Sequence, residues 1–116
     1  MLPRQHRLTK KEFSPALFSG RRFTEGPVVL YVQGAPRRSG MPSRLAFVMG
    51  QKAVKGAVAR NRLRRRARAL ARAHLLEISD GWHIVFLFRK ESAELSRDEL
   101  ERHLVLLLRR AGLVPS

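Results

Sequence analysis

Residues 60–72 carry seven arginines in thirteen positions, and no acidic residue interrupts them. Positive charges this close together repel one another unless a polyanion lies nearby. Phosphate is the usual biological polyanion, because each guanidinium can form paired hydrogen bonds with phosphate oxygens and each contact releases condensed counterions. The segment therefore predicts nucleic-acid binding before any fold is considered.

The rest of the charge is concentrated in the same part of the chain. The 116 residues contain 24 Lys and Arg against 9 Asp and Glu, a net charge of +15, and nineteen of the basic residues are arginine. Residues 26–76 hold twelve basic residues and no acid, whereas residues 77–116 hold six basic residues and seven acids. A pI near 11.9 is typical of nucleic-acid-binding domains. We therefore expect the middle of the chain to contact a polyanion and the C-terminal third to act as scaffold.

Composition excludes several classes of protein. The chain has no cysteine, which excludes disulfide scaffolds and thiolate metal sites and fits a reducing cytoplasm. Its apolar runs are far shorter than the roughly 18 residues that a membrane helix needs, and no signal peptide is recognised. With 44% apolar residues, the chain is predicted to form one domain over residues 1–116, with 1–6 and 113–116 loosely ordered.

The first predicted element is a helix near the N-terminus. Thr9 and Glu12 have the spacing of a capping box, and Gly20 can close the helix. Pro15 removes one hydrogen bond inside it, so we expect this helix to be short or kinked. A connecting loop should then run as far as Pro27.

Three segments are predicted to be strands, at 28–33, 44–50 and 82–88. In the first, Val29 and Tyr31 share one face. Both faces of 82–88 are apolar, which is typical of a strand in the centre of a sheet. If 44–50 and 82–88 are parallel neighbours, the basic segment between them is their crossover.

Two further helices are predicted, at 57–76 and from Ser96 to Gly112. In the first, an apolar stripe lies opposite a charged one. The apolar stripe comprises Ala59, Leu63, Ala67, Leu70 and His74, and the opposite side carries Asn61, Arg65, Arg68 and Arg72. Arg62 and Arg64 flank the charged side, while Arg60 and Arg66 border the apolar one. Ser96 and Glu99 form a second capping box, and the helix that follows should bury Leu100, Leu104, Leu107, Leu108 and Ala111.

The predicted order is helix, two or three strands, basic helix, strand and helix, which is a single α+β sandwich. Residues 44–68 resemble the signature of the bacterial ribonuclease P protein component, and their sequence is RLAFVMGQKAVKGAVARNRLRRRAR. The matching positions are Lys52, Val54, Ala57, Arg60, Asn61, Arg62, Arg64, Arg65 and Arg68. The likeness is collinear over roughly residues 7–112, and it departs from the family pattern at Leu17, Gln51, Ala53 and Gly56.

The resemblance implies a fold and a function. The fold would be a two-layer α/β sandwich, with a central four-stranded mixed sheet, three helices and a left-handed crossover. The function would be that of the protein subunit of ribonuclease P, which removes the 5′ leader from precursor tRNA in the cytoplasm. The resemblance implies that the RNA subunit performs the hydrolysis with bound Mg²⁺. Its partners would be the ribonuclease P RNA and precursor tRNA, with no membrane and no obligate protein partner.

Two sets of residues are the candidate sites. The RNA-binding set is Lys52, Lys55, Arg60, Asn61, Arg62, Arg64, Arg65, Arg68 and Arg72. Asn61 carries no charge, so its role would be to cap the helix or to orient its neighbours through hydrogen bonds, and Arg60 could instead cover the apolar stripe. The resemblance places the single-stranded leader in a cleft lined by Phe13, Leu17, Val29 and Tyr31. Simple core packing is the alternative for these four, and exposed aromatic rings would serve as stacking platforms for unpaired bases.

No candidate catalytic or metal-binding residue emerges from the sequence. His6, His74, His83 and His103 lack metal-ligand or acid–base spacing, so structural roles are expected for them, and Trp82 is expected in the core. Two alternatives to the ribonuclease P interpretation stay open at this stage. One is a structural ribosomal or RNA-binding protein with no role in processing, and the other is a nuclease that acts without RNA.

Overall fold

The computed structural model describes residues 21–34, 43–49, 56–78 and 81–114. These residues form strands β1 (Arg21–Glu25), β2 (Val28–Gly34), β3 (Arg44–Met49) and β4 (Trp82–Phe88), and helices α2 (Ala57–Ala73) and α3 (Arg97–Arg110). Short 3₁₀ helices lie at η3 (Leu75–Glu77) and η4 (Lys90–Glu94). The helix predicted between Thr9 and Gly20 lies outside the described residues.

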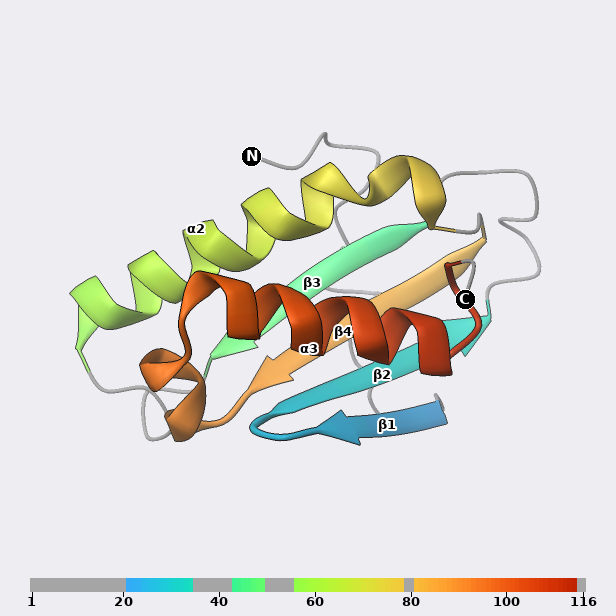
Figure 1. The fold of residues 1–116 in the computed structure, drawn as a ribbon. Coiled ribbons are helices and arrows are strands. Elements are labelled where there is room, and N and C mark those ends of the chain that lie inside the picture. The colour runs from blue at the N-terminus through green and yellow to red at the C-terminus, as the bar shows by residue number, and fades with distance from the viewer. Residues whose placement is uncertain (1–20, 35–42, 50–55, 79–80, 115–116) are drawn as a thin grey trace.

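The four strands form one mixed sheet in the order β1-β2-β4-β3 (Figure 1). β2 pairs antiparallel with both β1 and β4, whereas β3 pairs parallel with β4. The prediction that 82–88 is central is confirmed, and the parallel pairing with 44–50, on which the crossover depended, is present. The basic helix α2 connects this parallel pair.

The crossover through α2 has an uncommon hand. α2 and α3 cover the same face of the sheet (Figure 1). Seen from that face with β3 and β4 pointing upward, β4 lies to the left of β3. The connection is therefore left-handed, whereas about 98% of such units are right-handed.

Strand β1 was not predicted, and the expectation of a loop up to Pro27 was wrong. Only Phe23 of its five residues is apolar, so the segment lacks the alternation that indicates a strand. β1 is extended because it pairs antiparallel with β2, to which a two-residue loop joins it. Gly26 supplies the positive φ of 55° that such loops favour, and a Cβ there would lie 3.2 Å from the His103 ring.

The core lies between the sheet and the two helices. Alternate residues of β2 and β4 point into it, including Leu30, Ile84 and Phe86, all with no exposed surface. The rings of Phe47 and Phe86 stack with centroids 5.8 Å apart, and Phe88 stacks beside both. The predicted buried stripes of both helices are confirmed in their main members, and the full buried set of the helices is Leu63, Ala67, Leu70, Ala71, Leu100, Leu104, Leu107 and Leu108.

Helix α3 has well-formed ends. The Ser96 side chain accepts a hydrogen bond from the Glu99 N–H at 3.1 Å, and the Ser96 N–H donates to the Glu99 carboxylate at 2.9 Å. The bond from the Ser96 N–H to the carboxylate is the main cause that holds the pKa of Glu99 below its usual value, and the Ser96 hydroxyl lowers that pKa further. At the other end Gly112 has a φ of 74°, and the Leu113 N–H donates to the Leu108 carbonyl. The predicted capping box and the predicted stop are both confirmed.

Helix α2 ends three residues earlier than predicted. His74 terminates it, and the chain tightens into η3. The His74 ring pairs with the Glu77 carboxylate at 2.8 Å, so this histidine has the structural role expected of it.

Candidate RNA-binding surfaces

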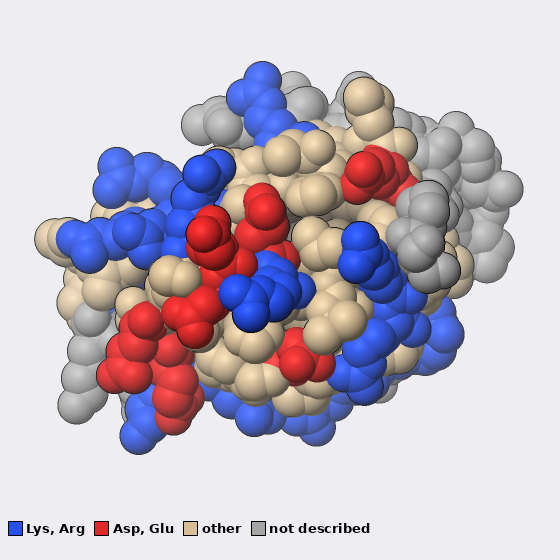
Figure 2. Space-filling view, viewed as in Figure 1, with Lys and Arg blue, Asp and Glu red and all other residues tan. Residues whose placement is uncertain are grey.

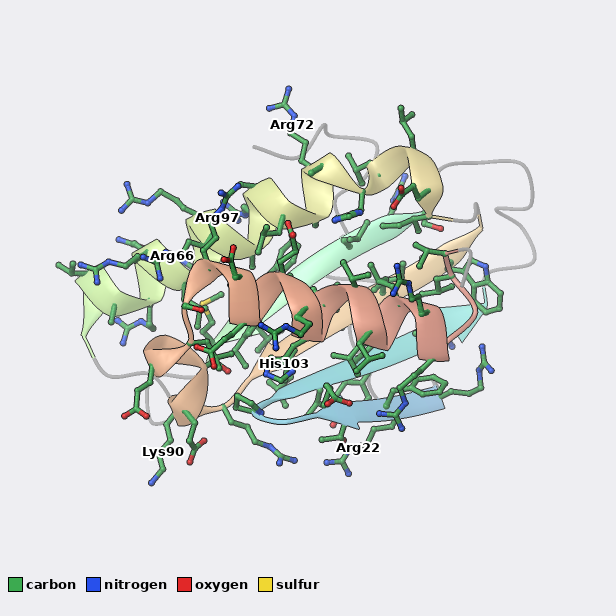
Figure 3. All side chains as sticks on the ribbon, viewed as in Figure 1. Arg22, Arg66, Arg72, Lys90, Arg97 and His103 are labelled. Atoms are coloured by element: carbon green, nitrogen blue, oxygen red, sulfur yellow. The ribbon has the colours of Figure 1, made fainter. Side chains whose placement is uncertain are left out.

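The outer side of α2 is the first candidate surface. Its exposed polar and charged residues are Asn61, Arg62, Arg65 and Arg72, while Arg60, Arg64, Arg66 and Arg68 are partly buried. The split follows from helical geometry, because the buried stripe through Leu63, Ala67 and Leu70 fixes which positions face away from the sheet. Arg72 projects away from the sheet in Figure 3. We call this set of arginines, with Asn61, the α2 surface.

The N-terminal end of α2 does little to offset this charge. Its first turn contains no acidic residue, and Gly56 at the N-cap position offers no side-chain hydrogen bond. The positive end of the helix dipole therefore adds to the field of the nearby arginines instead of being neutralised. This arrangement favours an anion supplied from outside the chain.

Asn61 orients one of the arginines. Its Oδ1 accepts a hydrogen bond of 3.2 Å from Arg64 Nη1, one helical turn away. Two roles were expected for Asn61, capping the helix or orienting a neighbour. The N-cap position is occupied by Gly56, so Asn61 has the second role, through its bond to Arg64. Fixing one guanidinium in this way lowers the side-chain entropy that it would lose on binding phosphate.

Two arginines of α2 also line a hollow. Arg62 and Arg66 face a small depression between α2 and η4, whose other walls include Ser92 and Ala93. Ser92 is buried and donates a hydrogen bond to the Pro27 carbonyl at 3.1 Å, so this wall is tied to the β1–β2 turn. The packing of α2 against η4 therefore shapes the hollow that these two arginines line.

The second candidate surface is the face of the sheet that α2 and α3 leave uncovered. Tyr31 is half-buried on it and pairs in register with Arg22 of β1 and Val85 of β4. The Arg22 guanidinium lies 5.9 Å from the centroid of the Tyr31 ring, a cation–π distance. Val29 shares this face but has no exposed surface, as does Val85. Val29 therefore supports Tyr31 as an apolar neighbour and offers no surface of its own. We call this set the Tyr31 face.

Four predicted site residues lie outside the described residues, namely Phe13, Leu17, Lys52 and Lys55. Among the others, the sheet separates the two sets. The arginines of α2 lie on the side of the helices, whereas Tyr31 and Val29 lie on the opposite side. Arg22 was missed by the sequence analysis, because the strand that places it beside Tyr31 gave no periodic signal.

Acidic residues occupy a separate region. Five of the nine acids lie within residues 91–101, in η4 and the first half of α3. Figure 2 shows them as a band between the basic side chains of α2 and those along β1 and the C-terminal end of α3. Within the described ranges, no three acidic or histidine side chains are placed to hold a metal ion. None of the described helices is long and apolar enough to cross a membrane.

The remaining aromatic and histidine residues pack as part of the scaffold. Trp82 is half-buried against the core and lies 5.8 Å from the Arg21 guanidinium. His83 is buried, and His103 contacts the β1–β2 turn at Gly26. These contacts are with the scaffold, as expected for structural side chains, while His6 lies outside the described residues.

Comparison with known proteins identifies the family. The family model for ribonuclease P matches residues 2–112. The chain belongs to the bacterial ribonuclease P protein family. A ribonuclease P protein component from Roseiflexus castenholzii is 36% identical over 97% of this chain and 91% of the relative. One from a Synechococcus strain is 33% identical over 100% of this chain and 89% of the relative.

Solved structures of ribonuclease P proteins share the fold. The Thermotoga maritima protein matches with a TM-score of 0.77 at 27% identity, over 90% of this chain and 96% of that one. The Staphylococcus aureus protein matches with a TM-score of 0.83 at 19% identity, over 95% of this chain and 98% of that one. Members of the family are subunits of the ribonucleoprotein endoribonuclease that processes the 5′ end of tRNA, so the partner of this chain is a ribonuclease P RNA.

Proposed function

We propose that this chain uses its two surfaces for two different RNAs. The α2 surface binds the ribonuclease P RNA, and the Tyr31 face holds the single-stranded 5′ leader of precursor tRNA in the bacterial cytoplasm. The RNA subunit and its Mg²⁺ carry out the hydrolysis. The observation that carries the proposal is the separation of an uncompensated arginine surface from a half-buried aromatic on the opposite face of one sheet.

The α2 surface suits folded RNA. Guanidinium groups contact phosphates without reading sequence, and each neutralised phosphate releases condensed counterions. Because the arginines project from a rigid helix, their spacing is fixed before binding, which favours an RNA with a fixed pattern of phosphates. Lys52 and Lys55 precede this helix in the sequence and would extend the same contact.

The Tyr31 face suits an unpaired strand. A base can stack on the Tyr31 ring, and the Arg22 guanidinium beside that ring can contact the adjoining phosphate. The buried Val29 and Val85 beside it keep the ring in a fixed position. Phe13 and Leu17 would complete this cleft.

The benefit to the reaction is preferential binding of substrate. Precursor tRNA carries a leader and mature tRNA does not, so a contact with the leader tightens substrate binding without tightening product binding. Product then dissociates readily, and the holoenzyme is free for another precursor.

The test is a binding comparison with the reconstituted holoenzyme. Wild-type chain with a bacterial ribonuclease P RNA should bind precursor tRNA more tightly than mature tRNA. Tyr31→Ala should reduce this preference by at least about fivefold, because base stacking on an aromatic contributes roughly 1–3 kcal/mol. Tyr31→Phe is the matched control and should keep the preference, since it retains the ring.

Two results would contradict the proposal. Equal affinity of the wild-type holoenzyme for precursor and mature tRNA would favour a structural RNA-binding protein. Leader removal by the purified chain with Mg²⁺ but without RNA would favour a nuclease that acts alone. We expect neither, and we expect the chain to support leader removal by the RNA at low Mg²⁺.

A further inference from the structure

A second group of arginines lies at the opposite edge of the sheet from β3. It consists of Arg21 and Arg22 of β1 and Arg109 and Arg110 of the last turn of α3, and all four are exposed. Figure 2 shows basic side chains gathered along this edge, separated from those of α2 by the acidic band. We call these four residues the β1-edge patch.

Two of the four also tie α3 to β1. Arg110 donates hydrogen bonds to the Thr24 carbonyl at 2.7 Å and to the Glu25 carboxylate at 3.3 Å. The Arg21 guanidinium lies 5.6 Å from the Phe23 ring and makes a long hydrogen bond of 3.4 Å to the Ala111 carbonyl. These contacts hold the guanidinium groups in place at the sheet edge.

The other two have no such role. Within the described part of the chain, neither Arg22 nor Arg109 has an acidic partner. Arg109 lies at the negative end of the α3 dipole, where a cation is stabilising, and this can account for its presence. The dipole does not account for Arg22, because it is on a strand and faces the opposite side of the sheet.

The patch is continuous with the Tyr31 face. Successive residues of a strand point to opposite faces, so Arg22 lies with Tyr31 while Arg21 lies on the side of the helices. β1 is an edge strand, and nothing in the described sheet pairs beyond it. A chain that leaves Tyr31 can therefore pass Arg22, turn around β1 and reach Arg21 and Arg109. Figure 3 shows Arg22 at this edge of the sheet, away from Arg66 and Arg72 of α2.

We propose that the β1-edge patch binds phosphates of the 5′-distal part of a long leader, after the strand has passed Tyr31. This rests on the proposed leader binding at the Tyr31 face and extends it. The charge of the patch complements a phosphate backbone, and half-buried Trp82 beside Arg21 adds an aromatic surface. The patch thus makes the protein sensitive to leader length, beyond the presence of a leader.

The experiment measures holoenzyme affinity for precursor tRNAs whose leaders grow one nucleotide at a time. The test variant is Arg22→Gln with Arg109→Gln, which removes two charges and spares the bonds of Arg21 and Arg110. The matched control is Arg97→Gln with Arg102→Gln, which removes two exposed arginines from α3 beside the acidic band. Thermal melting of each free variant verifies that it is folded.

Wild-type affinity should rise in two stages, first as the leader covers Tyr31 and again as it reaches the patch. The test variant should lose the second stage, and its first stage should weaken only by the one phosphate contact that Arg22 makes beside Tyr31. For the longest leaders this is a loss of about tenfold, with the salt dependence flattened by about 1.4 units of slope for two single-strand phosphate contacts. The control should keep both stages.

Equal losses at every leader length, including mature tRNA, would overturn the inference, and so would an unchanged second stage in the test variant. A wild-type holoenzyme that ignores the leader altogether would overturn both this inference and the proposed function. The two failures are therefore distinguishable, because wild-type affinity loses its first rise with leader length only if the proposed function itself is wrong.

Discussion

Helices α2 and α3 cover the same face of one sheet and bury similar apolar stripes, but their charged sides follow opposite rules. α3 has a complete capping box, acids in its first turn and arginines in its last. α2 has no side-chain cap and no acid in its first turn, and arginine pairs at i,i+4 spacing repel one another along it. The ends of α3 therefore stabilise the free chain. In α2, the missing cap and the repulsion between arginines lower the stability of the free chain, and the same arginines concentrate positive charge on one surface.

The comparison predicts first that the two helices do not differ in packing. Leu70→Ala in α2 and Leu107→Ala in α3 should each lower the free energy of unfolding by about 2–5 kcal/mol, since both side chains are fully buried in the same core. Urea denaturation of the free chain measures this. A small loss at Leu70 alone would mean that α2 is loosely packed in the absence of RNA.

The largest difference between the helices should be in RNA binding. Arg62→Glu or Arg65→Glu should weaken assembly with ribonuclease P RNA and flatten its salt dependence by about one unit of slope per lost phosphate contact. Arg102→Glu in α3 is the matched control and should change neither. Filter binding across a series of salt concentrations gives both values, and an unchanged slope would place Arg62 and Arg65 outside the interface.

The cap of α3 should matter to the stability of the free chain and little to binding. Ser96→Ala removes the acceptor of the Glu99 N–H and should destabilise the chain by about 1 kcal/mol. Assembly with RNA at saturating concentration should be unaffected. Thermal melting separates the two effects, and a matching loss of RNA affinity would show that α3 takes part in that interface.

Adding an acid to α2 should have the opposite pair of effects. Val58 is 70% exposed in the first turn, one turn before Arg62. Val58→Glu should stabilise the free chain by about 0.3–1 kcal/mol, because the carboxylate complements the helix dipole and pairs with Arg62. It should also weaken RNA binding. A variant that gains no stability would indicate that α2 is not strained by its own charge.

The smallest expected effect is a pH dependence that belongs to α3. The hydrogen bonds from the Ser96 N–H and hydroxyl lower the pKa of Glu99 in the folded chain below the ordinary value that it has in an unfolded chain. The stabilisation is therefore complete above the unfolded pKa and is lost as the pH falls through the folded pKa. Glu99→Gln should flatten the acid side of the stability curve. An identical acid limb in both proteins would show that the capping carboxylate contributes nothing.

Elements with local signals could be predicted from the sequence. The capping box at Ser96 and the glycine at 112 fixed the ends of α3, and the two apolar faces of 82–88 placed β4 in the sheet centre. The alternation in 28–33 assigned Tyr31 and Leu30 to opposite faces, as the structure has them. These succeed because each signal lies within a few residues of the element that it determines.

Features that arise from tertiary pairing could not be predicted. β1 is a strand because β2 offers it a partner, and its own residues give no indication. The cation–π contact between Arg22 and Tyr31 depends on that pairing, so the sequence analysis missed Arg22 as a site residue. The hand of the crossover was available only through the family resemblance, since periodicity carries no information about chirality.

The position of β4 affects how the chain is assembled during synthesis. β4 is the last strand to be made, yet it pairs with both β2 and β3. Until residue 88 has left the ribosome, only the β1–β2 hairpin can close, and β3 has no neighbour in the described sheet. A nascent chain that stops after α2 therefore carries its arginines on an incomplete sheet, so stable presentation of that helix to RNA has to wait for β4.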